Sequence, residues 1–344
     1  MNTQAHRQPS LRRVAEVAGV SVSTVSRYVN GKLLLSTATE SRVHEAMRNL
    51  GYQPLPGTSI EDEQHLQHNV IGILVPHLGN AYFGQAANEV VRAARNLDFS
   101  ALIASARDYS GYVDEYIDLL MSVPVKGLIC VGDLGNHDRL LELIQKQTPV
   151  VVTAEDASDL TNVDTVVADD YSGAFQATKS LIALGHQQIA FIGGPHRLGS
   201  STERERGWRD ALSSSGIDPN TNMREVGPYS VDFGAAALAR LLTLEKPPTA
   251  VFAASDTIAL GMLGAAPNLG ISVPKDLSII GYDDAPAAAL VAPRLTTVKT
   301  PLRIMAETSI TFLKERIANP SLPPRRSIIP VSFVQGLSTA PCTH

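Results

Sequence analysis

Six side chains suited to contacts with nucleic acid gather within residues 21–30. They are short hydrogen-bonding groups, one aliphatic group and one cation: Val22, Ser23, Thr24, Ser26, Arg27 and Asn30. Groups of these types bind base edges and phosphates in DNA. Helical spacing places most of them on one face, opposite the apolar side of the same helix. We predict that Val22, Ser23 and Arg27 contact base edges, with the neighbouring hydroxyls on phosphate or nearby bases.

Two short helices must hold these side chains. Ser10 can cap the first helix, Gly19 can end it in a left-handed conformation, and Ser21 can cap the second. The apolar positions that recur at helical spacing are Leu11, Val14, Ala15, Ala18, Val25 and Val29. The pattern predicts a helix-turn-helix pair, with Ser10 at a helix N-terminus that also faces DNA. The same pattern alone also fits a corner of any small helical bundle.

A third helix is expected to complete a small core. Ser36 or Thr37 can cap it, and Thr37 with Glu40 has the spacing of a capping box. Its apolar stripe consists of Val43, Ala46, Met47 and Leu50, and Gly51 follows. A domain of this size is marginally stable alone, so we expect dimerisation and DNA to help keep it ordered.

From residue 70 the pattern changes to alternating strands and helices. Apolar runs of strand length occur at 70–76, 100–104, 127–131, 150–153, 165–168, 188–192, 249–253, 277–281 and 328–333. Helical spacing occurs at 83–94, 112–121, 140–145, 173–183, 205–214, 233–242, 258–269 and 302–316. This alternation predicts an α/β body of parallel sheets covered by helices on both faces, long enough for two doubly wound lobes.

Polar and aromatic side chains shortly after these strands form a second candidate site, because small molecules bind at the carboxyl ends of parallel strands. The candidates for binding an effector are Tyr82, Phe83, Asp108, Arg204, Tyr229, Ser255, Asp256 and Asp283. Carboxylates and a guanidinium can each hold two sugar hydroxyls, and an aromatic ring can cover the apolar side of the sugar. Two alternatives stay open: Asp256 can cap the following helix, and Tyr82 and Phe83 can pack on their own lobe.

Charge is distributed unevenly along the 344 residues, whose net charge is −5. Residues 1–56 hold seven cations against three carboxylates, which leaves −9 for the remainder. A basic head on an acidic body is typical of a DNA-binding module attached to a sensor. The two cysteines, Cys130 and Cys342, show no metal-ligand spacing. Because neither a signal peptide nor an apolar segment of membrane-spanning length is present, we expect a soluble cytoplasmic protein without a membrane partner.

Known catalytic signatures are missing from the sequence. It contains no G-x-G-x-x-G after a strand, no P-loop, no G-x-S-x-G and no H-E-x-x-H. We therefore expect no enzyme activity, no cofactor and no metal. A solute receptor of the periplasm is an alternative for the body, but such a protein would not carry the helices of residues 10–51.

The helix pair resembles the N-terminal signature of the LacI/GalR family of bacterial transcription regulators. The matching string is Val14-Ala15-x-x-Ala18-Gly19-Val20-Ser21-x-x-Thr24-Val25-Ser26-Arg27-x-x-Asn30. The body is similar to the same family at Arg204-x-x-Gly207-Trp208 and at Tyr282-Asp283-Asp284. The resemblance implies a DNA-binding domain over 1–52, a linker over 53–69, and a periplasmic-binding-protein-like body over 70–344, with two lobes joined by three crossovers. It also implies that Arg204 and Asp283 line the cleft between the lobes.

The function implied by the resemblance is a ligand-responsive regulator, expected to be a repressor and a homodimer. Its partners would be double-stranded operator DNA and a small-molecule effector in the cleft, by default a sugar or sugar derivative, with a nucleoside or purine as the alternative.

Two departures from the family qualify this expectation. The linker has Leu55-Pro56-Gly57 and an acidic run, 61–63, where relatives have a helix that folds on DNA. Pro, Gly and carboxylates disfavour a helix beside phosphate, so a flexible tether, and even a sensor with weak or lost operator binding, stays open. Ala154-Glu155 replaces the usual Asp-Arg pair, leaving Glu155 or Asp156 as the substitute carboxylate.

Overall fold

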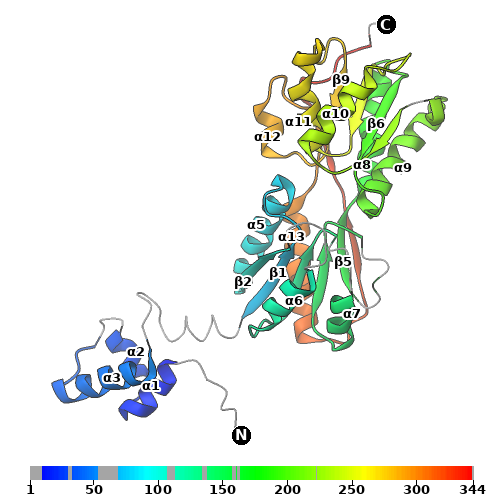
Figure 1. The fold of residues 1–344 in the computed structure, drawn as a ribbon. Helices are drawn as coiled ribbons and strands as arrows, with labels where there is room; N and C mark the ends of the chain where they lie inside the picture. Colours follow the sequence, from blue (N-terminus) through cyan, green and yellow to red (C-terminus); the bar gives the residue numbers. More distant parts are fainter. Residues whose placement is uncertain are drawn as a thin grey trace. The chain divides into compact units, whose positions relative to one another are not determined.

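The structure is a computed structural model that describes residues 10–29, 33–52, 69–106, 113–133, 138–156, 160, 163–221 and 223–342. The chain divides into two compact units, Met1–Val70 and Ile71–His344 (Figure 1). The predicted linker, apart from Asn69, lies outside the described residues, as do the candidates Asn30 and Asp108.

The first unit consists of three helices, α1 (Leu11–Ala18), α2 (Val22–Val29) and α3 (Thr37–Leu50). The predicted caps of the first two helices are confirmed: the Ser10 hydroxyl accepts from the Arg13 N–H, and the Ser21 hydroxyl accepts from the Thr24 N–H at 3.1 Å. The buried core comprises Leu11, Val14, Ala15, Ala18, Val25, Val43, Ala46, Met47 and Tyr52. Local capping and one apolar stripe per helix therefore account for the helix-turn-helix arrangement.

The capping box predicted for the third helix is wrong. Ser36 is the residue that precedes α3, and its side chain makes no capping hydrogen bond to the helix backbone. The Glu40 carboxylate instead accepts a hydrogen bond from the Tyr28 hydroxyl, which lies on α2. A tertiary contact between two helices thus replaces the local contact that the spacing of Thr37 and Glu40 indicated.

The first lobe of the second unit is built on a six-stranded sheet. Its strand order is β11 (Arg326–Ile329), β5 (Asp164–Ala168), β4 (Val150–Thr153), β3 (Leu128–Val131), β1 (Val70–Val75) and β2 (Ser100–Ser105). Helices α5 (Ala81–Asn96) and α13 (Leu302–Ala318) pack side by side on one face. Helices α6 (Val113–Met121) and α7 (Asp138–Gln145) cover the other face. The four inner strands β1, β3, β4 and β5 are buried on both faces, as predicted for a doubly wound sheet, whereas the edge strands β2 and β11 are partly exposed.

The second lobe repeats this plan on a four-stranded parallel sheet. The order is β7 (Arg224–Val226), β6 (Ile189–Gly193), β8 (Ala250–Ala253) and β9 (Ser278–Ile280). Helices α8 (Asp170–Ala183) and α9 (Gly199–Ser213) pack on one face around the buried Trp208. Helices α10 (Val231–Leu241) and α11 (Asp256–Ala265) pack on the other, with α12 (Pro286–Leu290) nearby.

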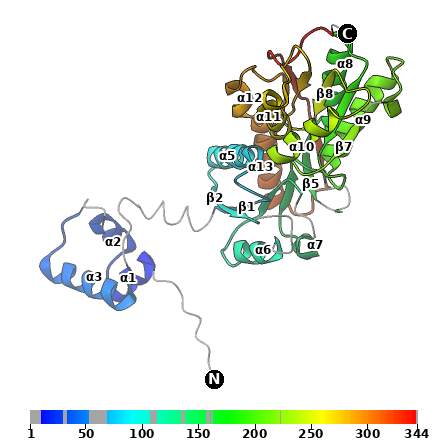
Figure 2. The same ribbon diagram turned by 45° about the horizontal axis from the view of Figure 1, so that its top comes forward.

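Three chain segments connect the two lobes of the body, which Figure 2 shows from a second direction. The chain crosses between β5 and α8, between β10 (Thr297–Lys299) and α13, and between β11 and β12 (Ser332–Val334). The strands β10 and β12 pair antiparallel beside the crossovers. The prediction of one strand over 328–333 is therefore wrong, because this segment joins two different sheets and Pro330, which lacks a backbone N–H, lies at the break.

Close packing of α8 against α9 requires a glycine at position 207. A Cβ atom there would collide with the Tyr171 carbonyl oxygen and lie 2.9 Å from the Ala174 Cβ. We expect Gly207→Ala to destabilise the body by about 1–3 kcal/mol through overpacking. Gly264→Ala in α11 is the matched control, because its Cβ would meet nothing within 4 Å, and there alanine should stabilise the helix by up to about 1 kcal/mol. Thermal unfolding of both variants tests this contrast; equal melting temperatures would contradict it.

Candidate functional site

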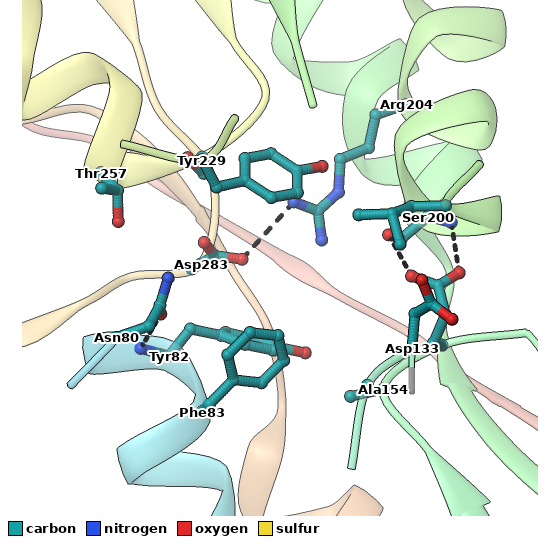
Figure 3. Close-up of a pocket in the computed structure, with 14 residues that line it drawn as sticks. Asn80, Tyr82, Phe83, Asp133, Ala154, Ser200, Arg204, Tyr229, Thr257 and Asp283 are labelled. Atoms are coloured by element: carbon teal, nitrogen blue, oxygen red, sulfur yellow. Dashed lines mark hydrogen bonds and ion pairs between the residues drawn. The ribbon is translucent and has the colours of Figure 1, made fainter. Parts of the chain in front are cut away.

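A cavity lies between the two lobes of the body (Figure 3). The first lobe contributes Asn80, Tyr82, Phe83, Gly132, Asp133, Ala154 and Glu155. The second lobe contributes Leu198, Ser200, Arg204, Tyr229, Ser255, Thr257 and Asp283. Most of these residues follow the carboxyl end of a parallel strand, which is where doubly wound sheets bind small molecules. Of the predicted effector-site residues, Tyr82, Phe83, Arg204, Tyr229, Ser255 and Asp283 are brought together here.

Arg204 is the positively charged residue that lines the cavity, and carboxylates of the protein already pair with its guanidinium. It lies in α9 and is 5% exposed. Its Nε lies 2.8 Å from Asp170 Oδ1, and its Nη1 donates to the Ala254 carbonyl at 2.6 Å. The Nη1 atom is also 3.6 Å from Asp283 Oδ1, and the guanidinium stacks 3.7 Å from the centre of the Tyr282 ring. These contacts fix the guanidinium in one orientation.

Asp283 faces the cavity from the end of the segment that follows β9. Its backbone has φ of 115°, a strained conformation for a residue other than glycine, and its N–H donates to the Val298 carbonyl at 2.7 Å. Burial raises the pKa of Asp283 well above its ordinary value, and the nearby carboxylates act in the same direction, against the effect of Arg204. Strain and burial at one carboxylate are typical of a residue held for binding.

Glu155 is the carboxylate that replaces the aspartate missing at position 154. Although it belongs to the first lobe, it accepts hydrogen bonds from Ser200 of the second lobe, at 2.9 Å from the N–H and 2.8 Å from the hydroxyl. It is 7% exposed, and burial raises its pKa. Asp156, the other residue that the sequence left open, instead pairs with Arg326 at 2.9 Å. Glu155 therefore links the two lobes at the cavity wall.

Aromatic side chains form much of the remaining wall. Asn80 caps α5 by accepting from the Tyr82 N–H at 2.9 Å, and this places Tyr82 and Phe83 at the start of the helix. Their rings meet edge to face with centres 5.5 Å apart, and both point into the cavity (Figure 3). The Tyr229 hydroxyl is buried without a hydrogen-bond partner in the described chain, and burial raises its pKa to about 12.

Asp256 does not line the cavity, which corrects its prediction as an effector ligand. Its side chain is fully buried, and its two oxygens accept from the Thr297 hydroxyl at 2.6 Å and the Ala285 N–H at 2.7 Å. Burial raises the pKa of Asp256 to about 7. The alternative role as a helix cap is also wrong, because Ser255 caps α11 by accepting from the Ile258 N–H. Asp256 thus has a structural role: it connects the segments that carry Thr297 and Ala285 and does not contact the cavity.

Several lining residues were missed by the sequence reasoning. Asp133 lies two residues after β3 and forms an ion pair with Arg197 of the other lobe. Ser200 and Thr257 lie in the first turns of α9 and α11 at the cavity. The rule that polar residues after strands form the site would have found Asp133. No sequence signal identifies Ser200, because its role depends on the opposite lobe.

On the DNA-binding candidate α2, the described side chains differ in exposure. Ser23 and Arg27 are exposed, whereas Val22 and Thr24 are partly buried. Ser26 is only 7% exposed, which corrects its placement on the polar face: it lies one residue from the fully buried Val25, at the edge of the core. The side chain of Leu34 is 97% exposed, and the sequence reasoning did not single it out. The face available to a partner is therefore centred on Ser23 and Arg27.

Within the described residues, no helix has the length and hydropathy needed to cross a bilayer. The same residues contain no group of three or more His, Cys, Asp or Glu side chains placed to hold a metal ion.

Comparisons with known proteins cover both units. A family model described as "Bacterial regulatory proteins, lacI family" matches residues 10–54, and one described as "Periplasmic binding protein-like domain" matches residues 178–339. The HTH-type transcriptional regulator DegA of Bacillus subtilis (strain 168) is 33% identical over 296 residues, which cover 85% of this chain and 86% of DegA. The relatives are thus transcription regulators rather than enzymes.

Solved structures give the same result. The lac repressor dimer bound to operator and the anti-inducer ONPF aligns with a TM-score of 0.75 and 30% identity, over 97% of this chain and 100% of that chain. A LacI family transcriptional regulator from Enterococcus faecium with bound ribose aligns with a TM-score of 0.73 and 29% identity, over 80% and 100% of the two chains.

Proposed function

Because this chain belongs to the lacI family of bacterial regulatory proteins, we propose that it binds operator DNA through α1–α3 and a sugar-type effector in the interlobe cavity. The DNA half of the proposal rests on α2, a capped helix whose exposed face carries Ser23 and Arg27. A structural relative bound to operator, the lac repressor dimer, supports it and supports a homodimer that acts as a repressor. Two such heads would enter successive major grooves of a near-palindromic site.

The effector half of the proposal rests on the convergence of Asp283, Glu155 and Arg204 with three aromatic rings in one cavity. Carboxylates accept hydrogen bonds from hydroxyl groups, and the rings can cover the apolar face of a sugar. The relative with bound ribose supports a ligand of this class. Effector binding would change DNA affinity to the extent that the ligand binds one lobe arrangement more tightly than another, and the coupling would be reciprocal.

Selection of genomic DNA fragments by the purified full-length protein tests the regulator proposal. The selection is repeated at two salt concentrations, because phosphate contacts alone are sensitive to salt and carry no sequence information. We expect recovery of a near-palindromic site that survives the higher salt. Recovery of only salt-sensitive, sequence-independent binding would overturn operator recognition and leave a ligand sensor.

Arg27→Ala should lower affinity for the selected site and relax its sequence preference. A side chain that contacts a base contributes about 1–3 kcal/mol of discrimination against the wrong base pair, so we expect the ratio of specific to non-specific binding to fall by about 5- to 150-fold. Arg48→Ala, which removes the same charge from the exposed surface of α3, is the control and should keep this ratio. Gel-shift titration on the selected and scrambled sites measures both; an unchanged ratio in Arg27→Ala would remove Arg27 from the base-contacting face.

A further inference from the structure

The carboxylates around the interlobe cavity exceed the cations. Arg204 is the one Lys or Arg among the described lining residues, and Asp170 and Asp283 both lie against its guanidinium. Asp133 is paired with Arg197 across the cavity. Glu155 then adds a further carboxylate, which is hydrogen-bonded to Ser200 and, among the described residues, not to a cation. The cavity therefore has an excess of negative charge when these groups are ionised.

Glu155 lacks a cationic partner in the described part of the chain. Its hydrogen-bond donors are the N–H and hydroxyl of Ser200 and the N–H of Asp156, all of them uncharged. Placing an ionised carboxylate in a site that is 7% exposed is costly unless a cation compensates it. The raised pKa values of Glu155 and Asp283 are the result expected for carboxylates that share a buried site with too little positive charge.

An anionic ligand would find no free cation among the described residues that line this cavity. The exposed N–H groups at the start of a helix are the other common binding site for a phosphate or carboxylate. At α9 that position is occupied by the protein's own carboxylate, because Glu155 accepts from the Ser200 N–H in the first turn. The Arg204 guanidinium is held by Asp170, Asp283 and the Ala254 carbonyl. The two other helices that begin at the cavity, α5 and α11, are capped by their own Asn80 and Ser255 side chains. The positive features of the wall are thus already occupied by groups of the protein itself.

We propose that the effector is a polyhydroxylated compound that carries a protonated amine, such as an amino sugar, and that Glu155 selects the amine. The amine replaces the Ser200 hydroxyl as the donor to Glu155, while the sugar hydroxyls bind Asp283. The rings of Tyr82 and Phe83 point into the same cavity and favour a cation through their faces (Figure 3). This inference rests on the proposed function, since it takes the cavity as the effector site, and it excludes phosphorylated and carboxylated sugars.

Titration of the full-length protein with matched sets of probes tests the inference. Each set holds a hexosamine, its parent hexose and the hexose 6-phosphate, in the gluco, galacto and manno series; calorimetry and ligand-induced shifts in melting temperature report binding. At least one hexosamine should bind about tenfold or more tightly than its parent hexose, with no binding of the phosphates. A parent hexose that binds as tightly as its amine, a phosphate that binds, or a failure of all three hexosamines to bind would overturn the inference.

Substitutions of Glu155 show whether the preference for the amine depends on the charge or on the shape of this side chain. Glu155→Gln keeps the size of the side chain and should lower hexosamine affinity by about tenfold, to the level of the parent hexose. Glu155→Asp keeps the charge and should retain the preference for the amine. Glu245→Gln is the control, because Glu245 is an exposed carboxylate between α10 and β8, at the end of the sheet away from the cavity. A preference that survives in Glu155→Gln would remove Glu155 from amine selection.

DNA binding, measured on the same preparations, distinguishes a failure of the proposed ligand class from a failure of the proposed regulator function. Protein that selects a near-palindromic site but prefers neutral hexoses overturns the charge inference and leaves the regulator function intact. Protein that binds hexosamines but selects no DNA site overturns the regulator function and leaves the ligand class standing. The melting temperature of Glu155→Gln without ligand, read in the same scans, shows whether this variant is folded.

Discussion

Asp283→Asn should remove the response to effector while leaving site-specific DNA binding in place. Asparagine preserves the shape of the side chain and, like aspartate, is among the residues that most often adopt a positive φ, which is 115° at this position. Arg204 keeps its contact with Asp170, so the wall should not collapse. The neutral amide of asparagine, however, cannot replace the carboxylate as acceptor of charge-assisted hydrogen bonds, each of which contributes about 1.5–3 kcal/mol. We expect effector affinity to fall by about 10- to 150-fold for each bond lost.

Asp284→Asn is the control for this substitution. Asp284 is the next residue along the chain, also has a positive φ, and pairs with Lys299 at 3.2 Å outside the interlobe cavity. It should bind effector like the unmodified protein. Affinity is measured by titration with the sugar that changes the melting temperature of the unmodified protein, and DNA binding by gel shift. Unchanged effector affinity in Asp283→Asn would remove Asp283 from the site.

Asp164→Asn should cause a large loss of stability without touching either binding site. Asp164 is fully buried at the start of β5, and Arg316 contacts it through Nε at 2.8 Å and Nη2 at 2.9 Å. Arg325 adds its own N–H at 2.9 Å and Nη2 at 2.9 Å. Removing the carboxylate charge leaves the buried Arg316 uncompensated. Breaking a buried ion pair in this way costs about 3–5 kcal/mol, which urea unfolding of the full-length protein can measure.

The pH dependence of stability should change with this substitution. Burial alone would raise the pKa of Asp164, but the hydrogen bonds and charges of Arg316 and Arg325 outweigh it and lower the pKa below its ordinary value. A carboxylate with a lowered pKa contributes its full stability above the unfolded-state pKa of about 3.9 and loses it as the pH falls through the folded-state pKa. Asp164→Asn should therefore be destabilised most at neutral pH, and the gap should narrow in acid.

Asp118→Asn provides the matched comparison. Asp118 pairs with Arg139 at 2.6 Å, but its side chain is 58% exposed. Exposed ion pairs contribute about 0–1 kcal/mol, so this variant should unfold close to the unmodified protein. Equal stability losses in the two variants would show that the buried position of Asp164 confers no special role.

Features that depend on neighbours within about four residues were predictable from the sequence. The Ser10 and Ser21 caps, the glycine at the end of α1 and the apolar stripes are of this kind. The buried strands were also predictable, since a short apolar run between helical segments has few alternatives in an α/β fold. Strand ends then placed Arg204, Asp283 and the aromatic residues near one site before any tertiary structure was considered.

Only the tertiary structure decided which polar residue performs which task. Glu155 and Asp156 are adjacent in the sequence, yet Ser200 and Arg326, far along the chain, determine that the first lines the cavity and the second does not. Asp256 also follows a strand, but Thr297 and Ala285 occupy both of its oxygens. Local sequence sets backbone conformation, because capping and periodicity act over one or two turns. The orientation of a polar side chain is set by partners on other elements, and these become neighbours only when the lobes are packed.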